Sequence, residues 1–133
     1  MKVRELIAGL DEKQRRSVSK CLDECRLVDP EEEVLVEVSK EVLDFVKVLA
    51  NPIRLSILKM LMNRWMCVCL IAKALDQDQT LISHHLRSLK RMGLLEERRE
   101  GKIRFYRTNP KSLREGIDGL IKEIGVPKSE ASD

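Results

Sequence analysis

The spacing of apolar residues changes at Gly93, and this change constrains the fold more than any other feature of the sequence. Before Gly93, apolar residues recur every three or four positions, which is the period of an amphipathic helix. After Gly93, apolar and charged residues alternate on either side of Glu100-Gly101, which is typical of a two-stranded hairpin. The 133 residues include only four aromatic ones, so aliphatic side chains must fill the core, as in small helical domains. The sequence therefore predicts a mainly α fold with one small β-hairpin.

Capping residues mark where the helices begin. Asp11 with Gln14 forms a capping-box pattern, and Asp29-Pro30 and Asn51-Pro52 each place a capping side chain before a proline at the first helical position. Asp76-Gln77-Asp78 forms a polar turn between two helices, and Gly93 stands where a left-handed C-cap needs glycine. We expect helices over residues 1–9, 11–26, 31–49, 52–63, 69–75, 79–92 and 110–124.

The length of the chain suits one domain with a short appendage. We predict an N-terminal helical extension over residues 1–28, one helix-rich domain over 29–125 and a polar tail over 126–133. No apolar run approaches the roughly 18 residues that read as a membrane span, and the first residues are charged, unlike a signal peptide. The sequence therefore predicts a cytoplasmic protein without a membrane partner.

Charge is distributed unevenly along the chain. Residues 1–50 carry nine Lys and Arg against twelve Asp and Glu, a balance of −3. Residues 79–107 carry eight Lys and Arg against three Glu, a balance of +5. One basic segment on an otherwise ordinary chain favours a polyanionic partner, and nucleic acid is the leading candidate.

The predicted helix over 79–92 has one apolar side and one polar to basic side. Ile82, Leu86 and Leu89 form the apolar stripe, so the opposite side is expected to face outward. The major groove of DNA admits such a helix, with short polar side chains near base edges and guanidinium groups near phosphates, and the basic hairpin would lie beside it. The alternative is that these charges only solvate an exposed face. The candidate DNA-binding residues are Gln79, Thr80, Ser83, His84, Arg87 and Arg91 on the helix and Arg98, Arg99, Lys102 and Arg104 on the hairpin.

Three segments match, in order, the motifs of a known protein family. Residues 49–58 (LANPIRLSIL) look like its L-A-D/N-P-x-R-x-x-I-L opening, residues 79–89 (QTLISHHLRSL) like its Q-x-x-V-S-H-H-L-x-x-L recognition helix, and residues 99–107 (REGKIRFYR) like its R-E-G-R-x-x-x-Y-R wing. Over about residues 34–124 the chain resembles the winged helix-turn-helix repressors of the ArsR/SmtB type. The resemblance implies a homodimeric DNA-binding transcription repressor, often released from its operator by a metal or metalloid ion. One departure is the turn, usually glycine, an apolar residue and serine, which is Asp76-Gln77-Asp78 here.

The four cysteines are expected to be reduced thiols, because the chain has no export signal. Cys67 and Cys69 stand where an extended piece passes into a helix. Inside a helix, positions i and i+2 face about 200° apart and could not share an ion. In extended geometry they face the same side, with Cys69 then at the helix N-cap, where the helix dipole favours a thiolate. A shared ion site is therefore possible only at such a junction.

The resemblance also covers the cysteines. The segment around Cys67 and Cys69 resembles the E-L-C-V-C-D-L metal box of the family, with Trp65 and Leu70 in place of the two acids. Cys21 and Cys25 share one helix face, and together with the other pair they are similar to the cadmium- and lead-sensing branch, in which four thiolates surround one soft ion. Thiolate ligands suit Cd, Pb, Zn or As(III). The alternatives are core packing of the cysteines and a reversible disulfide switch.

We predict a homodimer that binds double-stranded DNA at an imperfect palindrome, with the helices over about 31–49 and 110–124 forming the dimer interface. His84 is expected to face the DNA and His85 the neighbouring helix. No catalytic motif is present, so we do not expect an enzyme. The remaining alternatives are a redox-responsive or metal-independent winged-helix regulator and a protein-interaction module that kept the fold without binding DNA.

Overall fold

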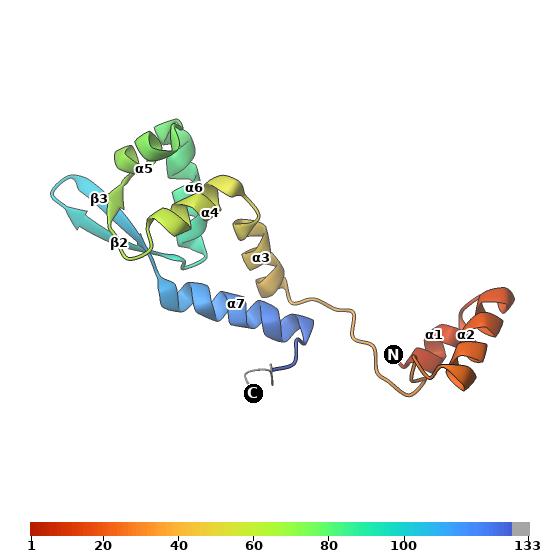
Figure 1. Ribbon diagram of the computed structural model, residues 1–133. Coiled ribbons are helices and arrows are strands. Elements are labelled where there is room, and N and C mark those ends of the chain that lie inside the picture. Colours follow the sequence, from red (N-terminus) through yellow and green to blue (C-terminus); the bar gives the residue numbers. More distant parts are fainter. Residues whose placement is uncertain (129–133) are drawn as a thin grey trace. The chain divides into compact units, whose positions relative to one another are not determined.

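The computed structural model describes residues 1–128, so the end of the predicted polar tail, residues 129–133, lies outside the described part. The chain forms two compact units, Met1–Glu37 and the residues from Val38 onward (Figure 1). No helix within residues 1–128 is both long and apolar enough to cross a membrane.

The first unit contains two helices, α1 (Val3–Ala8) and α2 (Glu12–Glu24). The predicted capping box of α2 is confirmed, because the Asp11 carboxylate accepts a bond from the Gln14 N–H at 2.8 Å and the Gln14 side chain accepts one from the Asp11 N–H at 3.3 Å. The segment after α2 folds back on the start of the chain: Lys2 and Glu33 form an isolated antiparallel bridge, and the N-terminal amine pairs with the Glu33 carboxylate.

The helix predicted over 31–49 is wrong in its first half. The structure begins α3 (Lys40–Leu49) after an N-cap at Ser39. The Asp29 carboxylate does accept a bond from the Glu31 N–H at 2.9 Å, but it does so in a turn. The N–H of Val34 then donates to the carbonyl of Met1 at 2.8 Å. Pairing with the N-terminal segment uses backbone groups that a helix would need, so residues 29–37 belong to the first unit.

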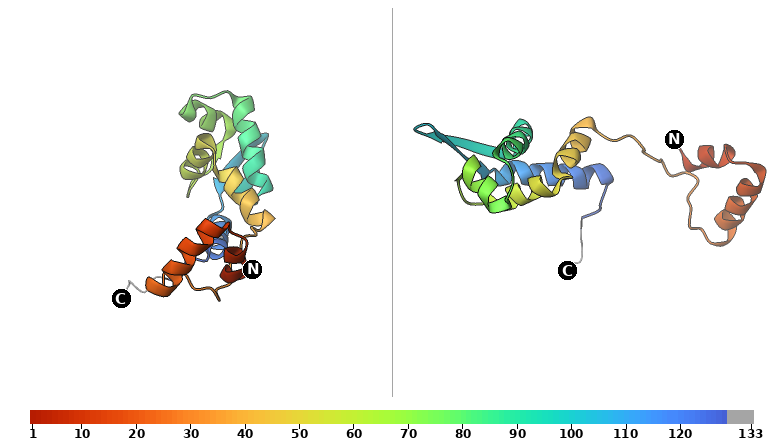
Figure 2. Two further views of the ribbon diagram at one scale, coloured as in Figure 1. Left: turned by 90° about the vertical axis from the view of Figure 1, so that its right-hand side faces the viewer. Right: turned by 90° about the horizontal axis from the view of Figure 1, so that it is seen from above.

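The second unit joins helices to a three-stranded sheet. Its sheet is antiparallel, in the order β1 (Met66–Cys67), β3 (Ile103–Thr108) and β2 (Leu95–Glu100), and the hairpin projects beyond the helices (Figure 2). The fold is mainly α with a small β-hairpin wing, as the sequence predicts. After α3, the elements are α4 (Pro52–Met60), β1 (Met66–Cys67), α5 (Val68–Leu75), α6 (Gln79–Arg91), β2 (Leu95–Glu100), β3 (Ile103–Thr108) and α7 (Pro110–Ile124).

The hairpin turn lies one residue later than expected. Glu100 pairs with Ile103, so Gly101 and Lys102 make the turn. Gly101 has a φ of 63°, and a positive φ at the first turn residue is the geometry of a type II′ turn, which glycine adopts without strain.

Aliphatic side chains fill the core of the second unit. Among the described residues, Phe45 is the one buried aromatic side chain. It lies against Gly116 of α7, where an added Cβ would stand 2.3 Å from the ring carbon Cε1. Glycine at position 116 therefore lets α7 pack closely on α3. The fully buried side chains are Ile57, Leu61, Ile71, Ile82, Leu86, Leu89, Leu94 and Thr108.

Candidate functional site

Helix α6 presents the polar side that the sequence predicts. Ile82, His85, Leu86 and Leu89 are buried against the rest of the unit. The opposite side carries exposed polar and basic residues, with Ser83 half-buried among them. The exposed members of the predicted set on this helix are Gln79, Thr80, His84, Arg87 and Arg91.

The two aspartates of the turn before α6 have structural roles. Asp78 is the N-cap of α6, and its carboxylate accepts bonds from the N–H groups of Thr80 and Leu81 at 3.0 and 3.3 Å. Asp76 ends α5 in the left-handed conformation, with a φ of 52°. Aspartate is among the few residues that adopt this region readily. The departure from the family's turn sequence therefore still makes a well-capped turn.

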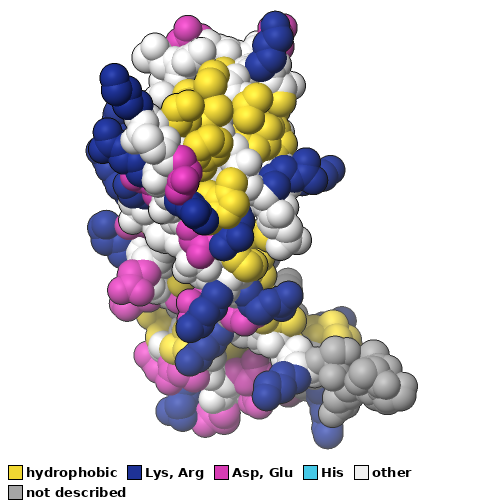
Figure 3. Space-filling view, turned by 90° about the vertical axis from the view of Figure 1, so that its left-hand side faces the viewer, with side chains coloured by type: hydrophobic (Ala, Val, Ile, Leu, Met, Phe, Trp, Pro, Cys, Tyr) yellow, Lys and Arg dark blue, Asp and Glu magenta, His cyan; other side chains and the backbone are white. Residues whose placement is uncertain are grey.

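The register of the hairpin divides its basic residues between two faces. Arg99 pairs with Arg104, and Glu97 pairs with Tyr106, so these four share the face that meets α6. Arg98 lies on the other face, where it bonds Glu100 at 2.8 Å. Lys102 lies in the turn at the tip. Lys and Arg side chains protrude around an apolar area on the side of the molecule where the hairpin lies (Figure 3).

A partly buried hydrogen-bond network joins the inner side of α6 to α4. The Arg54 Nε of α4 donates to His85 Nδ1 at 3.0 Å, and other guanidinium nitrogens donate to Ser88 Oγ and the Val48 carbonyl at 3.4 Å each. Burial lowers the pKa of His85, and the positive charges of Arg54 and His84 lower it further. The prediction that His85 faces the neighbouring helix is confirmed. His84, one position earlier, is exposed.

Cys67 and Cys69 come together at the junction between β1 and α5. Their Sγ atoms are 3.1 Å apart, with Cys67 buried and Cys69 exposed. Cys69 was expected at the helix N-cap, but the N-cap is Cys67 and α5 begins at Val68, so Cys69 is the second residue of the helix. The extended conformation of Cys67 (φ −89°, ψ 168°) is what brings the two thiols to one side.

The environment of this pair makes Cys67 the first thiol to ionise. Burial raises the pKa of Cys67, but bonds from the Cys69 thiol and from the backbone N–H groups of Leu70 and Cys69 outweigh burial and hold it below its ordinary value. The bond to Cys67 raises the pKa of Cys69. Such a pair offers one thiolate at the start of a helix, with a second thiol beside it.

Cys21 and Cys25 lie one turn apart at the end of α2 in the first unit. Cys21 is half-buried and Cys25 is exposed at the C-cap. A bond between their thiols raises the pKa of Cys21. Within residues 1–128, no three Cys, His, Asp or Glu side chains gather where they could hold one metal ion. The site of four thiolates stays a prediction.

Comparison with known proteins bears directly on these elements. The model of the bacterial regulatory protein family arsR matches residues 51–97, which run from α4 through α6 into β2. An uncharacterized HTH-type transcriptional regulator of Methanocaldococcus jannaschii is 38% identical over 90 residues, which are 67% of this chain and 92% of that protein. The chain belongs to the ArsR family.

Two further relatives place this ArsR-family protein among transcription regulators. The arsenical resistance operon repressor of Escherichia coli is 45% identical over 65 residues, which are 48% of this chain but only 56% of that repressor. The solution structure of a homodimeric winged helix-turn-helix DNA-binding domain from Mycobacterium bovis, from a possible ArsR-family regulator, has a TM-score of 0.53 and 29% identity. The match between the two structures covers 70% of this chain and 94% of that domain. The protein is a DNA-binding transcription regulator with a winged helix-turn-helix fold.

Four residues near the polar side of α6 in this ArsR-family regulator were not predicted from the sequence. Arg54, Asp78, Glu97 and Tyr106 line or support the polar side of α6. Arg54 stands in the L-A-N-P-x-R segment, so its motif could have drawn attention to it. The roles of Glu97 and Tyr106 depend on the strand register, which the sequence shows only to within a residue.

Proposed function

We propose that this regulator is a homodimeric repressor that inserts α6 into the major groove and places the hairpin on the DNA backbone. The observation that supports this most directly is the division of α6 into a buried apolar side and an outward polar side beside a basic wing. Small polar side chains at the start of α6 suit base edges, and the arginines suit phosphates. Such a regulator would act in the cytoplasm, where its operator lies.

An exposed apolar stripe on α7 supports the dimer. The side chains of Ile117, Ile121 and Ile124 remain 42%, 44% and 69% exposed. Leu43 of α3 is also exposed, and α3 packs on α7 through Phe45 and Gly116. We infer that α3 and α7 form the interface, with α3 beginning at Lys40. A two-fold pair would set the recognition helices about 34–36 Å apart and require an imperfect palindrome.

We infer that a soft ion, Cd, Pb, Zn or As(III), binds Cys67 and Cys69 and weakens DNA binding. The short distance between the two Sγ atoms supports this site, and related regulators are named for arsenical and cadmium resistance. Cys21 and Cys25 would join it from the same or the partner chain. Cys67 pairs with Phe105 in the sheet, so ion binding would pull on the strand that continues into the wing.

The DNA-binding proposal is tested by mobility shift on the DNA upstream of the protein's own gene, with random duplex as control. We expect specific binding that weakens steeply with salt. Equal binding to both duplexes would contradict it and favour the protein-interaction module.

The ion proposal is tested by titrating Cd(II) or As(III) into reduced protein and following thiolate charge-transfer absorbance. Cys67→Ser or Cys69→Ser should abolish the signal, Cys21→Ser or Cys25→Ser should reduce it, and Leu70→Ser, which keeps all four thiols, should leave it unchanged. Ion binding should release protons and strengthen as pH rises, because the ligands are thiolates. A bound ion that leaves DNA affinity unchanged would contradict the sensor.

The contact between the two sulfur atoms also favours a second candidate, a redox switch. Oxidation by a peroxide would join Cys67 and Cys69 as a disulfide, with the peroxide reduced to water or alcohol. Release from DNA by peroxide, reversed by dithiothreitol and without any response to Cd(II) or As(III), would favour this reading.

A further inference from the structure

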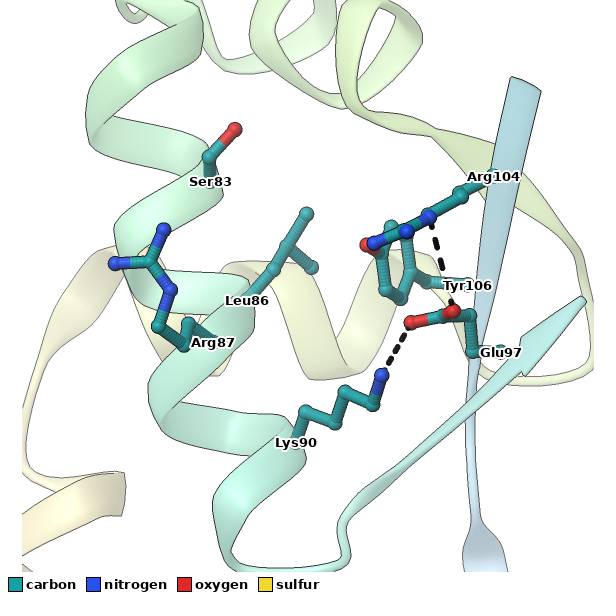
Figure 4. A pocket seen from close by; sticks show the side chains of 7 residues that line it. All are labelled: Ser83, Leu86, Arg87, Lys90, Glu97, Arg104 and Tyr106. Carbon is teal, nitrogen blue, oxygen red and sulfur yellow. Dashed lines mark hydrogen bonds and ion pairs between the residues drawn. The ribbon is translucent and has the colours of Figure 1, made fainter. Parts of the chain in front are cut away.

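A polar hollow of about 310 Å³ separates α6 from the inner face of the hairpin. Four of its residues come from successive turns of α6, and three come from β2 and β3 (Figure 4). Its lining includes three of the predicted DNA-binding residues, Ser83, Arg87 and Arg104. Its lining residues are Ser83, Leu86, Arg87, Lys90, Glu97, Arg104 and Tyr106.

Glu97 bridges the two walls of this hollow. Its Oε1 lies 2.6 Å from the Lys90 Nζ, and its Oε2 lies 3.9 Å from the Arg104 Nε. The two cations reach the carboxylate from opposite sides (Figure 4). The Glu97 side chain is 24% exposed, whereas Lys90 and Arg104 are 52% and 57% exposed. Both cations are therefore accessible to an anion from outside the protein, although the Glu97 carboxylate already pairs with them.

Other donors in the hollow have no partner in the described part of the chain. Within residues 1–128, no hydrogen bond or ion pair engages the side chains of Ser83, Arg87 or Tyr106. Three cations and one carboxylate line the hollow, which leaves it net positive. Hydroxyl and guanidinium donors around a positive hollow suit a phosphodiester group, whose two non-bridging oxygens share one negative charge and accept hydrogen bonds.

We propose that this hollow takes one phosphate of the DNA backbone and that Glu97 competes with that phosphate for Lys90 and Arg104. This inference rests on the proposed DNA binding through α6 and the wing. A phosphodiester and a carboxylate carry the same charge, so the incoming phosphate replaces Glu97 as the partner of both cations. Breaking the ion pairs of Glu97 with Lys90 and Arg104 costs free energy, and this cost lowers the affinity for DNA. Because every nucleotide offers the same phosphate, this competition lowers affinity for all sequences alike.

The decisive variant is Glu97→Gln, with Glu96→Gln as its matched control. Glu96 is the adjacent residue on the opposite face of β2, where it bonds Arg107 at 3.0 Å, and its substitution changes the net charge equally. We expect Glu97→Gln to tighten binding to operator and random duplex by about two- to fivefold, the usual range for a part-exposed ion pair. The slope of log affinity against log salt should change by less than about 0.9, the value for one phosphate contact, because both proteins bind the same phosphate. Glu96→Gln should change the affinity much less.

Tyr106→Phe, made in the Glu97→Gln background, should lower the affinity for both duplexes again, because it removes a donor and keeps the ring. Equal effects of Glu96→Gln and Glu97→Gln would overturn the proposal, since net charge alone would then explain the gain. Saturable binding of inorganic phosphate, strengthened by Glu97→Gln without any change in DNA affinity, would also overturn it. If the unaltered protein discriminates its operator but Glu97→Gln has no effect, this inference fails alone. If the unaltered protein does not discriminate its operator, the proposed function itself fails.

Discussion

The Arg54 Nε donates a 3.0 Å hydrogen bond to Nδ1 of the buried His85 and so ties α4 to the recognition helix α6. This bond needs a neutral imidazole, because a protonated His85 has no acceptor to offer. Burial and the adjacent guanidinium keep the pKa of His85 below its ordinary value. The contact that holds α6 in place is therefore sensitive to acid.

The free energy of unfolding should fall as the pH drops below about 6.5. Around that pH His85 becomes protonated in the unfolded chain, while in the folded protein, where its pKa is lower, it is still neutral. The contribution is fully present above that pH and is lost towards the lower pKa of the folded state. Thermal melts between about pH 5 and 8 measure it. His85→Gln should flatten the profile, whereas the exposed neighbour variant His84→Gln should keep it. Identical profiles for all three proteins would exclude His85 as the source.

Arginines on the two faces of the hairpin should differ in their effect on DNA binding. Arg104 faces α6 and Arg98 faces away. Arg104→Ala should weaken binding to every duplex and flatten the salt slope by about 0.9, and Arg98→Ala should do so less. Ser83→Ala or His84→Ala should instead change which sequences are preferred. Salt-dependent mobility shifts on operator and random duplex measure both effects, and a larger loss from Arg98→Ala would show that the wing meets DNA with its other face.

The two aspartates of the turn should respond in opposite directions. Asp76→Gly should raise the free energy of unfolding by up to about 1 kcal/mol, because glycine adopts the left-handed conformation of position 76 without strain. Asp78→Ala should lower it by about 1 kcal/mol, because it removes the cap of α6. Chemical denaturation measures both. Each change removes one negative charge, so a shift of the same sign would point to net charge instead of backbone geometry.

Gly116 and Gly119 form a matched pair on α7. Gly116→Ala should lower the free energy of unfolding by about 1–3 kcal/mol, because the new methyl group overlaps the Phe45 ring. Gly119 has nothing within 4 Å of an added Cβ, so Gly119→Ala should raise it by about 0.5–1 kcal/mol through helix propensity. Denaturation at fixed protein concentration tests both. A neutral Gly116→Ala would mean that α3 and α7 are not held in the close contact described.

The parts of the fold with strong local signals were predictable. The capping box at Asp11, the Asn51-Pro52 start and Gly93 at the end of α6 all specify their boundaries by side-chain chemistry within a few residues. Asp29-Pro30 gives the same signal and fails, because the chain there pairs with residues at its own N-terminus. A partner more than twenty residues away leaves no trace in local spacing.

The candidate site was predictable on the helix but only in outline on the hairpin. On α6, the helical period alone assigns Ile82, Leu86 and Leu89 inward and Arg87 outward. On the hairpin, alternation places Glu97 and Glu96 on opposite faces of β2 in any register. The expected turn at Glu100-Gly101 would pair Glu97 with Arg104, whereas the observed turn pairs Glu97 with Tyr106. The face that meets α6 was known only from the observed contact between Glu97 and Lys90.

The pairing of Glu97 with Lys90 also bears on how quickly a regulator of this kind can find its operator. Random duplex far outnumbers operator in any genome, so time spent on wrong sites limits the search. A carboxylate that lowers affinity for every phosphate alike shortens each wrong encounter, mainly through faster dissociation. The proposed contacts of α6 with base edges would then lengthen the encounter with the operator. In this proposal, the ion pair between Glu97 and Lys90 would therefore shorten the time that the regulator spends on wrong sites.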